Sequence, residues 1–456
     1  RSATPAAKAS TDMSKPSEHK QPRYRGAHWI KARLPAHSEP WLHGRKHSIR
    51  KRSKGTRAAS AELAALLQRY PWSWPKRPVY FFSDPHADAD AMLASLVASG
   101  GIRKTGARDK DFRLTGAGRR AQFLIGGDCF DKGPSCLRLL RTLKRVADRG
   151  GDLRILAGNH DVRVMLGMRS LLPDQDPMTR HFFIRMGGKG IPLLKEIHEH
   201  YVTTGRSHIH VPGARECRQR LFPDKNWFRK FPRAAAELLP QRTIDREMSR
   251  LNAKIEKFET QCHEAGLELD QVYAAALQWH RLFLKRKGEF SWFYRRMRLA
   301  LRRGSFLFLH AGLDDDVAWL INDRGVRNLN REFHQQLHEG GFRFYYGSIA
   351  NAIRTKYRST DKPLSRRGAS LVHDSGIHAI IHGHRSLNAG QRIALRKDMV
   401  NFECDITMDR HSRRREGLKG AGAGVTVVHP DGHITGISSD YPRAKVFDPR
   451  NLSLIA

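Results

Sequence analysis

The sequence of 456 residues is poor in cysteine. Its five cysteines are odd in number and form no Cys-x-x-Cys pair, which argues against a disulfide framework and against a structural zinc site. Proteins of a reducing compartment carry isolated cysteines of this kind as small buried side chains. A cytoplasmic location is therefore expected.

Long apolar runs are also missing. No stretch of about 18 apolar residues occurs, so no transmembrane segment is predicted, and no charged-then-apolar start resembles a secretory signal. The hydrophobic fraction of 39% still allows a large core in a chain of this length. We expect a soluble protein.

Acidic residues are scarce relative to basic ones. The chain has 82 Lys and Arg against 45 Asp and Glu, a formal net charge of +37. This charge predicts attraction to polyanions such as nucleic acid, an anionic membrane or a phosphorylated substrate, but a generally basic proteome or a solvated tail explains it equally well. Residues 1–58 contain few acids and are expected to form an irregular basic arm that is most basic at residues 45–54.

Five apolar runs, each ending in a polar side chain, are the main feature that is present. Residues 123–127 read as a buried strand that stops at two glycines and Asp128. The other four runs, residues 79–82, 153–156, 306–309 and 377–381, end in Asp84 and His86, in Asn159 and His160, in His310, and in His382 and His384. Open α/β sheets bind ligands at the carboxyl ends of their strands, and Asp, His and Asn suit divalent metals. The pattern predicts a metal centre at one edge of a sheet.

The rest of the pattern divides the chain into five parts. Helices predicted at residues 59–67, 89–99 and 137–147 alternate with the early strands, which indicates parallel β-α units. Residues 166–303 read as a mainly helical insertion, with an apolar stripe from Ile244 to Cys262 and further helices at residues 267–287 and 290–303. Its aromatic and basic residues near Trp292 suit either a binding surface or a packed helix with a solvated face. The chain is therefore divided into the arm 1–58, the insertion, two halves of one domain at 59–165 and 304–440, and a tail 441–456 that carries no signal. Strands near Phe402 and Val425 are expected to add antiparallel to the second half of the domain.

Taken in order, the five junctions resemble the motifs of the calcineurin-like metallophosphoesterases, in particular the Ser/Thr protein-phosphatase-like branch. The matching segments are Asp84-Pro85-His86, Gly127-Asp128-Cys129-Phe130-Asp131-Lys132-Gly133, Gly158-Asn159-His160-Asp161, His310 and Gly383-His384. The resemblance implies an α/β fold, a four-layer αββα sandwich of two mixed sheets interrupted by the helical insertion. It also implies two divalent metal ions at the carboxyl ends of the strands, manganese above all, with iron, zinc or cobalt as alternatives.

The resemblance implies a role for each matched residue. Asp84 and His86 would hold the first metal, Asp128 would bridge both, and Asn159, His310 and His384 would hold the second. A hydroxide between the metals would attack phosphorus while His160, oriented by Asp131, protonates the leaving oxygen.

Three positions depart from the family pattern. Lys132 stands where the protein-phosphatase branch has an arginine clamp, and lysine supplies charge but no two-pronged fork. The second histidine of Gly-His-x-His is absent; Arg385 follows His384 as a substitute phosphate contact, and His382 is an alternative ligand ranked below His384. Ala87 occupies a position where the family often has glycine, which matters if that backbone needs positive φ.

The expected activity is hydrolysis of a phosphate monoester, on a small molecule or a phosphoprotein. Two alternatives stay open from the sequence: a nucleotide or nucleic-acid phosphoesterase, including dinucleoside polyphosphate hydrolysis, and a non-catalytic scaffold that binds a polyanion through its basic surface. Nucleic acid is a conceivable partner on charge alone.

Overall fold

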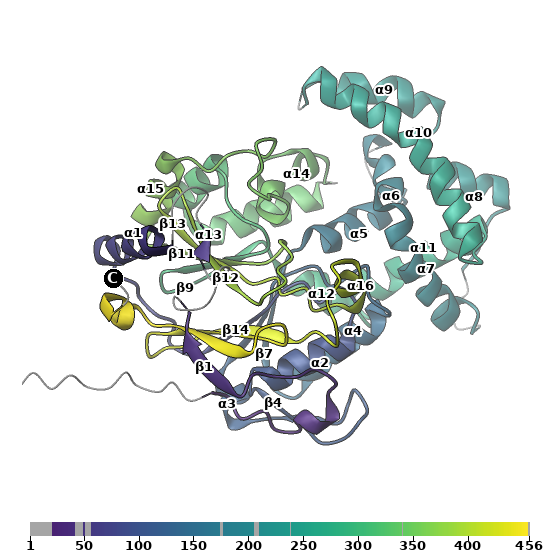
Figure 1. Cartoon of the computed structure of the whole chain (residues 1–456). Coiled ribbons are helices and arrows are strands. Elements are labelled where there is room, and N and C mark those ends of the chain that lie inside the picture. The colour runs from purple at the N-terminus through teal and green to yellow at the C-terminus, as the bar shows by residue number, and fades with distance from the viewer. Residues whose placement is uncertain are drawn as a thin grey trace, which may run out of the picture.

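Two mixed β-sheets form the centre of the molecule (Figure 1). The computed structural model describes residues 21–41, 49–50, 56–173, 177–204, 209–237, 239–339 and 341–454. The eight-stranded sheet has the order β1 (His37–Pro40), β16 (Arg443–Phe447), β15 (Ile434–Ser438), β14 (Gly424–Val428), β3 (Val79–Phe82), β6 (Gln122–Ile125), β7 (Asp152–Leu156), β8 (Met297–Arg298). The six-stranded sheet has the order β2 (Ile49–Arg50), β12 (Arg392–Arg396), β13 (Met399–Glu403), β11 (Ala379–His382), β10 (Phe306–Leu309), β9 (Ala300–Arg303). A small hairpin pairs β4 (Ile102–Lys104) with β5 (Phe112–Leu114).

Alternation along the strands places side chains on two sides of each sheet. In β3, Val79 and Phe81 join a cluster that also contains Phe306, Phe308 and other side chains of the six-stranded sheet, whereas Tyr80 and Phe82 pack among helices. Because successive strand residues point to opposite faces, four buried apolar residues in a row serve two cores. The cluster shared by the two sheets holds them together.

Helices cover the outer faces of the sheets. Those of the sheet-forming parts are α1 (Thr56–Arg69), α2 (Ala89–Ala98), α3 (Gly116–Arg120), α4 (Cys136–Asp148), α5 (Asn159–Arg169), α13 (Asp315–His338), α14 (Phe342–Tyr346), α15 (Arg366–Asp374) and α16 (Arg410–Arg415). Side-chain caps fix where several begin: Asp88 accepts from the Ala91 amide at the start of α2, and Ser135 accepts from the Arg138 amide at the start of α4. The early β-α units predicted from the sequence are present, with β3, β6 and β7 parallel to one another.

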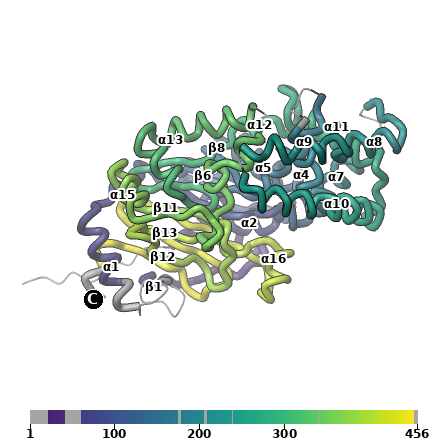
Figure 2. The backbone as a smooth tube through the Cα atoms, turned by 90° about the horizontal axis from the view of Figure 1, so that it is seen from above, coloured from purple at the N-terminus to yellow at the C-terminus, as the bar shows by residue number. Residues whose placement is uncertain are grey.

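The insertion extends away from the sheets. It contains α6 (His181–Met186), α7 (Ile191–Ile197), α8 (Ala214–Leu221), α9 (Lys225–Ala235), α10 (Gln241–Glu264), α11 (Leu269–Phe283) and α12 (Ser291–Arg296), with shorter turns at Pro177–Thr179, Gly187–Gly190 and His198–Val202. Helices α8, α9 and α10 lie at one end of the molecule in both views (Figures 1 and 2). The predicted apolar stripe of α10 is buried from Ile244 to Cys262, apart from the half-buried Met248.

Several segments differ from the sequence-based expectation. The helix expected at residues 290–303 ends at Arg296, because Met297, Leu299 and Leu301 then follow the two-residue period of strands β8 and β9. The late strands do not simply add antiparallel to the second half: β13 runs parallel to β11, and β14 joins the other sheet beside β3.

Both chain ends contribute to the sheets. Within the arm expected to be irregular, β1 pairs with β16, β2 pairs with β12, and Trp41 is fully buried between the sheets. Most of the basic stretch 45–54 lies outside the described residues. The tail supplies β16 and a 3-10 turn at Pro449–Leu454. Within the described residues, no helix combines the length and apolarity needed to cross a membrane.

Candidate metal centre

The five junctions predicted from the sequence meet in space, but they come from two sheets. Asp84 follows β3, Asp128 follows β6 and Asn159 opens α5 after β7, all in the eight-stranded sheet. His310 follows β10 and His384 follows β11 in the six-stranded sheet. The side chains therefore converge where the carboxyl ends of both sheets adjoin, and not at the edge of a single sheet.

The backbone turns sharply at the first, second and fifth junctions. Asp84, His86, Asp128 and His384 have φ values of 53°, 38°, 56° and 65°, in the left-handed region that side chains rarely adopt. Such a conformation costs roughly 1–3 kcal/mol per residue and persists only when surrounding contacts enforce it. Ala87, where the family often has glycine, also has a positive φ of 54°. The turn thus has the shape that a glycine would adopt without strain.

Two glycines allow the junctions to approach one another. A Cβ on Gly158 would lie 2.0 Å from the Asp128 amide nitrogen, and one on Gly383 would lie 1.7 Å from Ser83 Oγ and 2.1 Å from Asp84 Oδ2. The Asp128 backbone cannot move aside cheaply, and the Ser83 and Asp84 side chains are held by their own hydrogen bond. The glycines of the third and fifth motifs are therefore needed for packing around the site.

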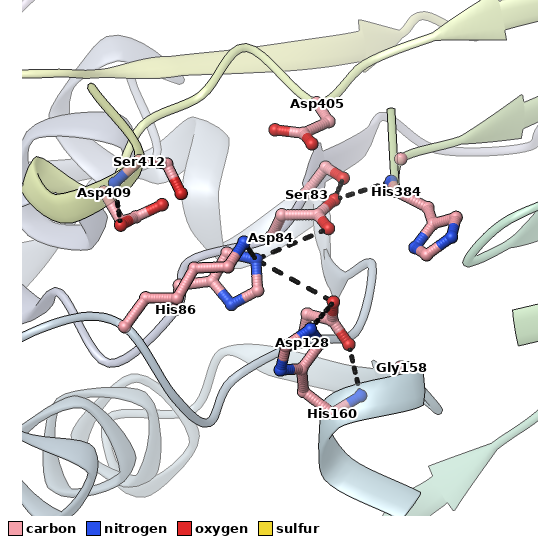
Figure 3. A network of polar contacts seen from close by, with 12 residues as sticks. Ser83, Asp84, His86, Asp128, Gly158, His160, His384, Asp405, Asp409 and Ser412 are labelled. Carbon is pink, nitrogen blue, oxygen red and sulfur yellow. Dashed lines mark hydrogen bonds and ion pairs between the residues drawn. The ribbon is translucent and has the colours of Figure 1, made fainter. Parts of the chain in front are cut away.

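The first ligand group comprises Asp84, His86 and Asp128, whose donor atoms lie within 4.8 Å of one another. His86 Nδ1 lies 3.1 Å from the Phe130 carbonyl oxygen, which fixes the ring so that Nε2 faces the carboxylates. Nε2 is 3.9 Å from Asp84 Oδ1 and 3.8 Å from Asp128 Oδ2 (Figure 3). Asp84 Oδ2 accepts from the His384 amide at 3.0 Å and from the Ser83 hydroxyl.

The second ligand group comprises Asp128, His310 and His384. His310 Nδ1 donates to the Gly126 carbonyl oxygen at 2.7 Å, and His384 Nε2 donates to the Arg354 carbonyl oxygen at 3.1 Å. Each ring thus turns its other nitrogen inward, and His310 Nε2 lies 3.2 Å from His384 Nδ1 and 3.4 Å from Asp128 Oδ2. Asp128 belongs to both groups, as a bridging carboxylate must.

Asn159 provides a test of whether the cluster suits a cation. Its Oδ1 lies 3.2 Å from His310 Nε2, so an amide oxygen faces a ring nitrogen whose partner Nδ1 already carries the hydrogen. Turning the amide round would let Nδ2 donate to His310 Nε2 and His384 Nδ1. The turned amide would satisfy these groups without an ion, so its orientation does not decide the question. The donor set itself fits divalent metal ions, because carboxylate, amide oxygen and imidazole are the ligand types that they accept.

The pKa shifts of His310, Asp128 and Asp84 also indicate that the cluster favours added positive charge. Burial lowers the pKa of His310, but the carboxylates of Asp128 and Asp84 outweigh it and raise the pKa to about 10. Burial raises the pKa of Asp128, yet His310 and His160 hold it well below its ordinary value. Burial, followed by repulsion from Asp128, raises the pKa of Asp84. The two carboxylates repel each other unless a cation lies between them.

His160 and Asp131 form a pair beside the bridging carboxylate. His160 Nδ1 lies 2.5 Å from Asp131 Oδ2, and His160 Nε2 lies 3.8 Å from Asp128 Oδ2 (Figure 3). The His160 backbone amide donates to Asp128 Oδ1 at 2.9 Å. Asp131 Oδ1 is buried and has no hydrogen-bond partner within the described residues. The pair can hold a proton at Nε2 on the face of the metal ligands.

Of the remaining predicted residues, only Lys132 points into the cluster. Its Nζ lies 2.7 Å from His86 Nε2, the nitrogen that faces Asp84 and Asp128. Arg385 instead contacts Glu403, with NH1 3.0 Å from Oε1. His382 is fully buried within β11, its Nδ1 lies 3.0 Å from the Gly383 carbonyl oxygen, and it belongs to neither ligand group.

Two buried carboxylates at the site, Asp161 of the third motif and Asp405, were given no role from the sequence. Asp161 accepts from four backbone amides, those of Asp128, Cys129, Phe130 and Gly158, and so holds the second motif against the third. Asp405 lies beside Asp84 (Figure 3), and burial followed by that neighbour raises its pKa well above the ordinary value. Its signal was the end of β13, a strand parallel to the ligand-bearing β11.

Two cations near the site were also missed. Arg163 lies one turn after Asn159 on α5, and its NH2 is within 3.1 Å of the Asn159 amide. The pKa of Lys189 is lowered by burial and by Arg163, while Asp131 and Asp128 raise it, which places the ammonium close to the site. Neither residue follows a strand, so the strand-end pattern could not find them.

Comparisons with known proteins give structural likeness only. No protein-family model matches the chain, and no curated protein matches its sequence significantly. Among solved structures, a cold-active protein tyrosine phosphatase is similar with a TM-score of 0.41 and 13% identity over 81% of this chain and 78% of that one. Its counterpart from a psychrophilic Shewanella has a TM-score of 0.39, 12% identity and coverages of 82% and 80%.

A protein serine/threonine phosphatase from Saccharomyces cerevisiae is similar at a TM-score of 0.34 and 9% identity, over 86% of this chain and 88% of that one. These neighbours are phosphatases, but likeness at this level does not assign a function. The assignment rests on the residues of the site.

Proposed function

We propose that this chain is a metal-dependent phosphoesterase that hydrolyses a phosphate monoester, with the four-layer sandwich of the calcineurin-like metallophosphoesterases. The observation that carries the proposal is Asp128, one buried carboxylate shared by two ligand groups. Asp128 lies between His86 of one group and His310 and His384 of the other. Two metal ions that share Asp128 as a ligand would account for this arrangement.

Asp84, His86 and Asp128 would hold one metal, and Asp128, Asn159, His310 and His384 the other. Two divalent ions bound there would polarise the phosphoryl group and make hydroxide available at neutral pH. Manganese is the first choice on the family resemblance, and iron, zinc and cobalt are alternatives that the mixed oxygen and imidazole donors also suit. The protein's own contribution is to fix the donors, which the hydrogen bonds of His86, His310 and His384 accomplish.

His160 would deliver a proton to the leaving oxygen from Nε2. Asp131 accepts at Nδ1, which orients the ring and stabilises its charged form when the proton is held. The 3.8 Å between Nε2 and Asp128 Oδ2 places that proton beside the proposed reaction centre. The pair therefore supplies general acid catalysis without being a metal ligand.

Positive side chains would hold the phosphate oxygens. Lys132 has its ammonium in the cluster, and Arg163 and Lys189 carry charge from the adjacent α5 and the Gly187–Gly190 turn. Three separate cations can replace the forked arginine that the protein-phosphatase branch has at the position of Lys132. Arg385 remains a further proposed contact, although Glu403 already engages its guanidinium.

A substrate panel with controlled metal content tests the proposal. The purified chain is stripped of metal, reconstituted with manganese, iron, zinc or cobalt, and assayed on aryl phosphates, alkyl phosphates, a phosphopeptide, a nucleotide and a dinucleoside polyphosphate. We expect metal-dependent hydrolysis of phosphate monoesters, abolished by chelation. Asp128→Asn, assayed in parallel, removes the shared charge with little change in shape.

Either of two results would contradict the proposal. One is no hydrolysis of any substrate with any metal, although the metals bind. The other is hydrolysis that persists undiminished in Asp128→Asn, which would place the chemistry elsewhere.

A further inference from the structure

A cavity of about 750 Å³ lies at the β8 edge of the eight-stranded sheet, away from the metal ligands. It is bordered by the start of β7, by the segment joining α12 to β8, and by the middle of α13. Six arginines line it: Arg154, Arg295, Arg296, Arg298, Arg327 and Arg331. None of its lining residues belongs to the metal centre.

Four of these arginines have no acidic partner among the residues that the structure describes. Arg154 Nε donates to Asp152 Oδ1 at 2.7 Å, and Arg295 donates to the carbonyl oxygen and hydroxyl of Ser291, each at 3.0 Å. Asp152 is the one acidic side chain lining the cavity, and it also pairs with Arg77. Arg296, Arg298, Arg327 and Arg331 form no ion pair or side-chain hydrogen bond with any residue that the structure describes.

Arginines of the cavity lower the pKa values of two residues beside it. The pKa of His334, which lines it, is lowered by burial and then by Arg298. The pKa of Arg303 is lowered by burial and then by Arg154 and Arg77. Arg296, Arg298, Arg327 and Arg331 are exposed, so solvent screens their mutual repulsion, and a bound anion would offset what remains of it.

We propose that this cavity is a binding site for a compact oligophosphate, a small molecule carrying several adjacent phosphate groups. Guanidinium groups bind phosphate oxygens through two parallel hydrogen bonds, and four free forks around one space suit several phosphates at once. The volume admits a small molecule. The lining has no Trp, Tyr or Phe, so it lacks the stacking surfaces that proteins use for exposed bases.

The site stands independently of the proposed phosphoesterase activity. The cavity is reached at Asp152, where β7 begins, whereas Asn159 lies beyond the end of that strand. Oligophosphate bound there leaves the metal ligands untouched. The site therefore serves to recognise or sense a phosphorylated molecule and not to cleave it.

Calorimetric titration of the full chain with inorganic tripolyphosphate tests the proposal. Arg327→Ala/Arg331→Ala removes two forks from adjacent turns of α13, where alanine keeps the helix. We expect binding to the cavity to weaken by about tenfold to a hundredfold, because each lost pair of charge-assisted hydrogen bonds is among the stronger polar contacts. Arg327→Lys/Arg331→Lys keeps the charge and should lose affinity by a smaller factor, since the forks are gone.

The matched control is Arg103→Ala/Arg113→Ala. These exposed arginines face each other on β4 and β5, outside the cavity, and their removal lowers the net charge by the same amount. The control should bind tripolyphosphate as the unaltered chain does. Neither double variant touches the metal centre, so tripolyphosphate bound there contributes equally, and hydrolysis of an aryl phosphate should be equal in both.

Three results would overturn the proposal. Equal weakening in both double variants would show that net charge alone attracts the anion. Unchanged binding in Arg327→Ala/Arg331→Ala would show that the cavity is not the site. Tighter binding of a single-stranded RNA than of tripolyphosphate, lost specifically in Arg327→Ala/Arg331→Ala, would make the cavity a nucleic-acid site.

Discussion

Two groups of buried charged residues lie at strand ends, one around Glu403 and one around Asp84 and Asp128, and their carboxylates are neutralised differently. Glu403, the last residue of β13, is fully buried and is surrounded by Arg385, Arg392 and Arg396. Asp84 and Asp128 are equally buried, but their polar partners are histidines, backbone amides and the Ser83 hydroxyl. One cluster has its positive charge built in, whereas the other must obtain most of it from outside.

The difference shows that burial alone does not identify a metal site. Burial raises the pKa of Glu403, but His382 and the arginines outweigh it and hold the pKa at about 2. Arginine stays charged at any ordinary pH, so this cluster is complete without a ligand. At Asp128, histidines supply only titratable protons that a metal ion can replace. The nature of the cations around a carboxylate therefore separates a structural charge cluster from a metal centre.

The largest effect is expected from a substitution in the cluster of Asp84 and Asp128, which lacks built-in positive charge. Asp128→Asn should leave manganese-reconstituted protein with a clear loss of bound metal, and hydrolysis should fall to background because both ligand groups lose their shared charge. Elemental analysis after desalting measures the metal. Glu403→Gln, in the complete cluster, is the control and should retain the metal. An unchanged metal content in Asp128→Asn would refute the bridging role.

His160→Ala should reduce turnover by about 10²–10⁴-fold with the metal content unchanged, because His160 is placed to transfer a proton and not to ligate. The loss should be smaller for aryl phosphates than for alkyl phosphates, since a good leaving group needs less protonation. Steady-state rates on a series of leaving groups measure this. An equal loss across the series would indicate that His160 only positions the substrate.

Glu403→Gln should destabilise the fold by about 3–5 kcal/mol, because three arginines are left around a neutral group. The pKa of Glu403 is depressed from 4.5 in the unfolded chain to about 2, so its stabilisation is complete above pH 4.5 and is lost as the pH falls toward 2. Urea unfolding from pH 7 to pH 2 should show a smaller loss for the variant than for the unaltered chain. Parallel profiles would exclude this contribution.

A smaller effect is expected of Lys132→Ala, an increase in KM of about tenfold for loss of one charge-assisted contact to phosphate. Arg385→Ala sharpens the comparison, since its guanidinium belongs to the complete cluster. We expect that variant to lower the unfolding free energy and to change KM less than Lys132→Ala does. The reverse ranking would establish Arg385 as the main phosphate contact.

The strand-end pattern predicted much of the fold and the site because strands are short and their ends are fixed. The runs at Val79–Phe82 and Phe306–Leu309 are strands with the predicted bounds, and each delivers its polar residue directly after its end. A buried strand followed by glycine and a carboxylate leaves few alternatives in backbone geometry. The local sequence therefore fixes the direction in which Asp84 and His310 leave their sheets.

What could not be predicted depends on partners distant in sequence. Arg385 follows the ligand His384, but only the register of β12 and β13 brings it to Glu403. Lys189 carries no local pattern, and Asp405 follows a strand end, but its place beside the site depends on how β13 pairs with β11. Likewise, the alternation from Met297 to Leu301 is short enough to pass for one side of a helix.

The pairing of β1 with β16 and of β2 with β12 has a consequence for how the chain avoids self-association. Strands β1 and β2, only eight residues apart, cap β16 at the margin of one sheet and β12 at the margin of the other. An uncapped margin presents free amides and carbonyls on which another chain can extend the sheet. Strands β1 and β2 thus each cover a sheet margin, and Trp41, directly after β1, is buried between the sheets. Removing the chain up to residue 54 would remove both strands, and the shortened chain should aggregate through the two uncovered margins.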